Sequence, residues 1–130
     1  MLSFHHVGLL VQDIELQINS TYGLLFGKEN ISEKIYVSSQ KVFICLIKTG
    51  IDSFIELIQP LEEGPLDKLL KKGIVYYHMA YLTDNFHEER VKFLSLDFKA
   101  LNEFNSEAFN GNKCQFFYSS EGHLIELIEK

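Results

Sequence analysis

The segment IELI occurs twice in the chain, at residues 55–58 within SFIELIQP and at residues 125–128 within HLIELIEK, at an offset of 70. Earlier in each half, FHHVGLLVQDI (residues 4–14) aligns with YYHMAYLTDNF (residues 76–86) and pairs His6 with His78 at an offset of 72. Two landmarks in the same order at nearly the same spacing indicate a tandem duplication.

Both halves predict the same order of elements, a strand and a helix followed by three strands. In the first half, β-branched and aromatic residues predict strands at 4–11, 35–37, 42–48 and 54–58. Asp13 is the expected N-cap of a helix that runs to about Phe26, and Gly27 can end it. In the second half the expected strands are 76–82, 98–101, 114–118 and 124–128, with a helix from an Asp84 cap to about Leu96.

Residues 66–72, LDKLLKK, predict a short helix between the halves, with Pro65 in its first turn and Gly73 at its end. The sequence therefore predicts an α+β fold in one domain made of two tandem βαβββ modules. Module 1 is expected at about residues 1–62, the connector at about 63–73 and module 2 at about 74–130.

The composition narrows the function classes. With 130 residues, 46% of them hydrophobic, the chain has the size and balance of a single soluble domain. Its net charge of −6 disfavours nucleic acid as a partner. No apolar run is long enough for a membrane span, and the N-terminus lacks the basic region of a signal peptide. Cys45 and Cys114 lie in apolar runs and are expected to be buried, unpaired thiols, which fits the cytoplasm.

Two carboxylates interrupt apolar strands. Alternation places Phe54, Glu56 and Ile58 on one face of a strand, and the repeat places Glu126 on the equivalent face. A buried carboxylate without a partner is costly, so a cation, a metal or a proton-transfer role is expected to compensate it. His6 and His78 interrupt the first strand of each half in the same way. The repeat selects His6 over His5, because Tyr77 is equivalent to His5.

Twofold packing of the modules would bring the two imidazoles and the two carboxylates to one point. Mixed nitrogen and oxygen ligands suit one divalent transition metal ion, such as Ni, Co, Zn, Mn or Fe. Taken singly, a strand histidine is more often a hydrogen-bonded core residue, and a strand glutamate more often faces solvent. The metal hypothesis therefore rests on the four residues together: His6, Glu56, His78 and Glu126.

These residues, with HHVGLLVQDI, IELIQPL, YHMAY and LIELIE around them, resemble the vicinal oxygen chelate superfamily, which includes glyoxalase I and methylmalonyl-CoA epimerase. The resemblance covers essentially the whole chain. It implies a cup-shaped mixed sheet, a metal at these four positions and a homodimer. Its glyoxalase I branch has the ligand order His, Glu, His, Glu, which implies Glu126 as the catalytic base with Glu56 as its partner.

The expected function is that of a metal-dependent, glyoxalase I-like lyase or isomerase that moves a proton next to a carbonyl of a small hemithioacetal or acyl-CoA substrate. Where glutathione-type enzymes have arginine and asparagine, this chain has Leu9-Leu10 and Gln59-Pro60, which leaves the thiol cofactor open.

Two alternatives stay open. The segment after Glu56 resembles the epimerase branch, although the second epimerase base aligns approximately with Ser39. A metal-free protein that sequesters an apolar ligand, such as an antibiotic, is the alternative of another class.

Overall fold

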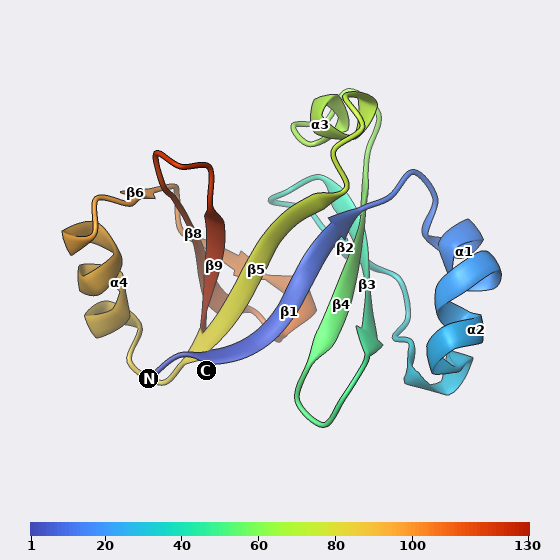
Figure 1. The fold of residues 1–130 in the computed structure, drawn as a ribbon, viewed down its shortest axis with the longest axis horizontal. Helices are drawn as coiled ribbons and strands as arrows, with labels where there is room; N and C mark the ends of the chain where they lie inside the picture. Colours follow the sequence, from blue (N-terminus) through green and yellow to red (C-terminus); the bar gives the residue numbers. More distant parts are fainter.

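The computed structural model describes residues 1–130 and contains a single nine-stranded mixed sheet (Figure 1). The strands are β1 (Ser3–Leu10), β2 (Ile35–Val37), β3 (Val42–Lys48), β4 (Phe54–Pro60), β5 (Tyr76–Thr83), β6 (Lys99–Ala100), β7 (Phe104–Ser106), β8 (Asn112–Tyr118) and β9 (Leu124–Glu129). The helical segments are α1 (Ile14–Gln17), η1 (Ile18–Tyr22), α2 (Gly23–Phe26), η2 (Lys28–Asn30), α3 (Asp67–Lys71), α4 (Phe86–Ser95) and η3 (Glu107–Phe109).

The sheet has the order β2-β3-β4-β1-β5-β9-β8-β6, with β7 paired to β8. Within the first half β1 is parallel to β4, and within the second half β5 is parallel to β9. The two halves join through the antiparallel pair β1 and β5 at the centre of the sheet. This arrangement confirms the predicted α+β class and the curved sheet built from two βαβββ units. The exact module boundaries stay a prediction.

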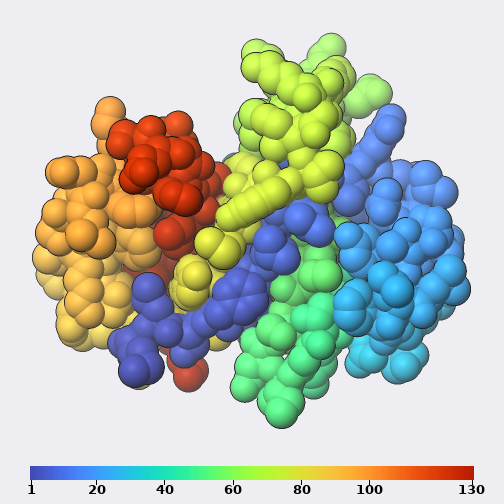
Figure 2. Space-filling model, in the orientation of Figure 1, coloured from blue at the N-terminus to red at the C-terminus, as the bar shows by residue number.

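Strand alternation separates two apolar layers. On the outer face, Leu57 and Ile47 pack against Ile14 of α1, and Leu127 packs against Phe93 of α4. On the inner face, Ile58 belongs to a second buried cluster. Figure 1 shows α1 and α2 on one flank of the molecule, α4 on the other and α3 at the top, with β1 and β5 crossing between the flanks. In the same view, the space-filling drawing shows that no helix covers β1 and β5 on this face (Figure 2).

The first helical region begins and ends where the sequence predicts. The Asp13 side chain accepts a hydrogen bond from the backbone N–H of Leu16 at 3.1 Å and caps α1. Gly27 ends α2 with φ of 83°, a left-handed conformation that favours glycine. Between the two α-helical turns, η1 is a π-helical segment that propensity did not predict.

Three local predictions need correction. Asn85, not Asp84, caps α4, because Oδ1 of the Asn85 side chain accepts a hydrogen bond from the backbone N–H of Glu88 at 3.2 Å. Pro65 precedes the Leu66 cap of α3 and so lies outside the helix. Strand β7 was not predicted, because two of the three residues in Phe104–Ser106 are asparagine and serine, which are poor β-formers.

The structure also bears on the state of the cysteines and on the character of the helices. Cys45 and Cys114 are free and buried, as predicted. None of the helices has both the length and the apolar character needed to cross a membrane.

Candidate metal centre

Two β-bulges shape the central strand pair. Phe4 pairs with Tyr81 and His6 with Ala80, so His5 is an extra residue in β1. Gly8 pairs with His78 and Leu9 with Tyr76, so Tyr77 is the extra residue in β5. The two bulges occupy repeat-equivalent positions. Bulges redirect side chains and are common beside active sites.

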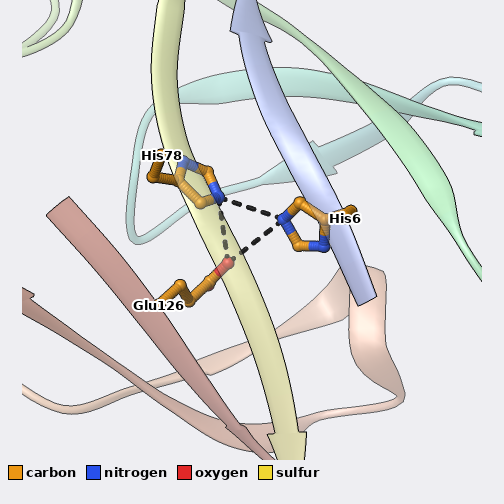
Figure 3. A group of neighbouring side chains, drawn as sticks. All are labelled: His6, His78 and Glu126. Atoms are coloured by element: carbon orange, nitrogen blue, oxygen red, sulfur yellow. Dashed lines mark hydrogen bonds and ion pairs between the residues drawn. The ribbon is translucent and has the colours of Figure 1, made fainter. Parts of the chain in front are cut away.

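His6, His78 and Glu126 form a compact buried cluster, drawn in Figure 3. The two histidine Nε2 atoms lie 3.0 Å apart. Oε1 of Glu126 lies 3.3 Å from Nε2 of His6 and 3.2 Å from Nε2 of His78. The three ligand atoms come from β1, β5 and β9 and point at one another. The predicted convergence of these three side chains is therefore present in the structure.

Glu56 approaches the same point from β4 on the other side of β1. Its Oε1 lies 3.4 Å from Nε2 of His6 and 3.7 Å from Nε2 of His78. Glu56 is buried, with 5% of its surface exposed, and Glu126 with 4%. The structure thus places Glu56 beside both histidines at slightly longer distances than Glu126, while the group of mutually close ligand atoms consists of His6, His78 and Glu126.

The buried histidine and glutamate side chains shift the pKa values of one another. Burial lowers the pKa of His6, but Glu56 and Glu126 raise it more through their charges and hydrogen bonds, to about 10. Burial raises the pKa of Glu126, but the hydrogen bonds from His6 and His78 outweigh it and hold the pKa well below its usual range. Without an ion, a proton on His6 therefore balances part of the negative charge. A divalent cation would balance both carboxylates.

The distances in this cluster fit a bound transition metal ion. With metal–ligand bonds of about 2.1 Å, neighbouring ligand atoms lie about 3.0 Å apart at right angles and about 3.4 Å apart in a tetrahedron. The two imidazole nitrogens lie 3.0 Å apart, and the separations between an imidazole nitrogen and a carboxylate oxygen run from 3.2 to 3.7 Å. Two imidazoles and two carboxylates also form a ligand set that such ions accept.

A small cavity of about 30 Å³ opens beside the cluster on the inner face of the sheet. Nine of its 14 lining residues are hydrophobic, and none is lysine or arginine. Glu56, His78 and Glu126 are part of its wall, so a small ligand there would contact the cluster directly. The other polar residues of the wall are Gln40 and Ser106, and Tyr77, one of the nine hydrophobic residues, carries a hydroxyl. Burial raises the pKa of Tyr77, so its hydroxyl stays protonated and can donate a hydrogen bond.

Ser39 lies outside the cavity, and one contact of His6 was not predicted from the sequence. Ser39, aligned with an epimerase base, is exposed and does not line the cavity, whereas its neighbour Gln40 does. The contact between His5 and His6 was not predicted, because the repeat comparison selected His6 and set His5 aside. Its Nδ1 lies 2.8 Å from Nδ1 of His6, and burial with the nearby His6 charge lowers its pKa to about 4. The unusual His5-His6 pair was the signal that could have drawn attention to it.

Comparison with known families decides the classification. The family model described as "Glyoxalase/Bleomycin resistance protein/Dioxygenase superfamily" matches residues 5–118, which include His6, Glu56 and His78. The chain belongs to this superfamily. Enzymes of the superfamily typically use a divalent metal ion, and the buried cluster of His6, His78 and Glu126 is placed to hold one. No curated protein matches the chain.

Solved structures share the superfamily fold with this chain. Methylmalonyl-CoA epimerase from Mycobacterium tuberculosis has a TM-score of 0.82 and 22% identity, over 97% of this chain and 86% of that one. A Streptomyces coelicolor methylmalonyl-CoA epimerase variant in complex with 2-nitronate-propionyl-CoA has a TM-score of 0.85 and 21% identity, over 100% and 96%. A hypothetical protein from Bacillus halodurans C-125 has a TM-score of 0.77 and 24% identity, over 99% and 94%.

Proposed function

We propose that this protein is a metal-dependent enzyme that moves a proton next to a carbonyl group, in the manner of a glyoxalase I-like lyase. One observation carries the proposal: the imidazoles of His6 and His78 and the carboxylate of Glu126 converge within 3.0 to 3.3 Å at the wall of an apolar cavity, and the Glu56 carboxylate lies 3.4 and 3.7 Å from the two imidazoles. His6, Glu56, His78 and Glu126 would hold the ion. When bound, a divalent ion polarises a substrate carbonyl and stabilises the negative charge that develops on its oxygen.

The protein groups divide the remaining tasks. Glu126 takes the carbon-bound proton through a carboxylate oxygen and returns it to the neighbouring carbon, with Glu56 as its partner across the site. The aliphatic and aromatic wall of the cavity excludes water and receives the small acyl part of the substrate. The Tyr77 hydroxyl and the Gln40 amide can donate hydrogen bonds to substrate oxygens.

The inventory of bases favours a one-base reaction. Glu56 and Glu126 are the only carboxylates in the cavity wall, and both belong to the metal cluster. Gln40, on the turn between β2 and β3, has an amide that cannot act as a base. Ser39 is exposed outside the cavity. An epimerase needs a base on each face of its carbanion, so this arrangement suits a lyase or isomerase better.

Acyl-CoA epimerisation is the second candidate, because several of the similar structures are methylmalonyl-CoA epimerases. One of them is described in complex with methylmalonyl-CoA and NH4+, with a TM-score of 0.84 and 20% identity. For this candidate the Glu56 and Glu126 carboxylates would both have to act as bases on the substrate.

Proton magnetic resonance in D₂O separates the candidates. Nickel- or cobalt-loaded protein is mixed with hemithioacetals of methylglyoxal and several thiols, and separately with methylmalonyl-CoA. We expect conversion of a hemithioacetal to a 2-hydroxyacyl thioester, and unchanged turnover in the Ser39→Ala variant. Rapid exchange of the methylmalonyl-CoA α-proton, without hemithioacetal turnover, would support the epimerase. Tight binding of apolar ligands without any turnover would support the sequestering protein.

Two further properties are part of the proposal. The buried free thiols of Cys45 and Cys114 support a reducing compartment such as the cytoplasm. The homodimer stays a prediction, and light scattering of the purified protein measures it.

A further inference from the structure

The two proposed histidine ligands differ in what their outer ring nitrogens contact. Nδ1 of His6 lies 2.8 Å from Nδ1 of His5, within hydrogen-bond distance. Nδ1 of His78 is buried without any hydrogen-bond partner. The residue equivalent to His5 is Tyr77, whose ring meets the His78 ring edge-on at a centroid distance of 4.9 Å and makes no hydrogen bond to it. The two halves therefore differ at the Nδ1 side of their histidines: His6 has a hydrogen-bonding neighbour there and His78 has none.

His5 is held in place from two sides. Its ring stacks on Phe54 at a centroid distance of 4.9 Å and meets Phe109 edge-on at 5.3 Å. The bulge in β1 brings it next to the His6 ring, although consecutive strand residues normally point to opposite faces. A ring fixed by aromatic packing on both sides can hold a hydrogen bond in one direction.

We propose that His5 is a positioning residue that accepts the Nδ1–H of His6 and so keeps the Nε2 lone pair of His6 directed at the metal ion. This inference rests on the proposed metal site. A neutral imidazole has one N–H and one lone pair, so coordination through Nε2 requires the proton on Nδ1. An acceptor for that proton fixes the tautomer and the ring orientation, as outer partners of metal-bound histidines generally do. His5 would in turn keep its own proton on Nε2.

Calorimetric titration of the chelator-stripped full-length protein with Ni²⁺ tests the inference. The His5→Phe variant keeps an aromatic ring between Phe54 and Phe109 but loses the acceptor, and we expect its affinity to fall about 10- to 100-fold. The His5→Asn variant places an amide oxygen near the position of Nδ1, and we expect it to recover most of that loss. His123→Gln, at an exposed histidine outside the cluster, is the control and should bind Ni²⁺ as the wild type does.

Two outcomes would overturn the role of His5 while the metal site stands: full affinity in His5→Phe, or an equal loss in His5→Asn and His5→Phe. A wild-type protein that binds no metal would instead remove the proposed function itself. Should His5→Phe fail to fold, ¹⁵N resonances of the histidine rings in the zinc-loaded wild type decide the question. We expect His6 to carry its proton on Nδ1, and a bare Nδ1 would contradict the proposal.

Discussion

The two halves of this protein place their metal-binding candidates in the same way and surround them differently. Each half contributes a histidine beside a β-bulge and a glutamate from its last strand, and the strand pairings that carry them match. Around them, His5 corresponds to Tyr77, and Gly8 corresponds to Ala80. The regular helix α4 corresponds to a helix interrupted by the π-helical segment η1.

This comparison separates the parts of the site that the duplication supplied from those that each half added. The shared parts are the four side chains that meet at one point. The differing parts decide how each imidazole is held and what lines the cavity, because Gln40 comes from the first half and Ser106 and Phe116 from the second. Substitutions at equivalent positions therefore test both the shared site residues and the surrounding residues that differ between the halves.

The carboxylates are expected to be unequal in catalysis although they are equivalent in the repeat. We expect Glu126→Gln to lower the rate of substrate proton transfer about 10²- to 10⁴-fold, because the base is lost, while some metal binding remains. Glu56→Gln should lower this rate by a factor that is at least about tenfold smaller than the factor for Glu126→Gln. Rates in D₂O by proton magnetic resonance measure both variants. Full activity of Glu126→Gln, or the reverse order, would contradict the assignment of the base.

Gly8 lies opposite His78 in the central strand pair, where a side chain would not fit. A methyl group at Gly8 would overlap the His78 imidazole, which is 1% exposed and cannot move aside freely. We expect Gly8→Ala to weaken Ni²⁺ binding more than about tenfold and to lower the free energy of unfolding by about 1–3 kcal/mol. Calorimetry and urea denaturation measure the two effects.

A glycine on the surface provides the control for this substitution. A methyl group at Gly50 would lie 2.8 Å from the Ser53 hydroxyl, which belongs to an exposed turn and can rotate away. Gly50→Ala should therefore bind metal normally. Equal behaviour of Gly8→Ala and Gly50→Ala would show that His78 has room to move.

Metal binding should depend on pH through His6. Burial lowers the pKa of His6, while the Glu56 and Glu126 carboxylates raise it, to about 10, so the ring is protonated at pH 7 in the metal-free protein. That proton must leave before Nε2 can coordinate, so affinity should rise with pH by up to about tenfold per unit below pH 9. Calorimetry in two buffers of different ionisation enthalpy should also detect about one proton released per Ni²⁺.

His123 is the control histidine, because it is exposed and lies outside the cluster. The His123→Gln variant should keep the pH dependence of the wild type. An affinity that does not change between pH 6.5 and 8.5 would mean that His6 does not give up a proton to the ion.

The smallest predicted effect concerns a link between the halves at the edge of the cup. The Ser38 hydroxyl donates to a Glu107 carboxylate oxygen at 2.8 Å, and both residues are exposed. We expect Ser38→Ala to lower the free energy of unfolding by about 0.5 kcal/mol or less, because an exposed hydrogen bond competes with water. Ser39→Ala, next to it in the same turn, is the control and should leave stability unchanged.

Much of the fold could be predicted because the repeat pairs equivalent strands and because alternation is clear in the apolar strands. The sets Phe54, Glu56, Ile58 and Ile55, Leu57 do face opposite sides, and the four predicted site residues do come together. The bulges could not be predicted, because an extra residue leaves the composition of a strand unchanged. For that reason the position of His5 beside His6 was missed.

The central claim is that His6, Glu56, His78 and Glu126 hold one metal ion, and a titration of chelator-stripped protein with Ni²⁺, Co²⁺, Mn²⁺ and Zn²⁺ tests it most directly. The His78→Ala variant is measured beside the wild type, and His123→Gln serves as the control. We expect one ion per chain in the wild type and the control, and binding at least about 100-fold weaker in His78→Ala. An absence of binding by the wild type, or equal binding by His78→Ala, would contradict the central claim.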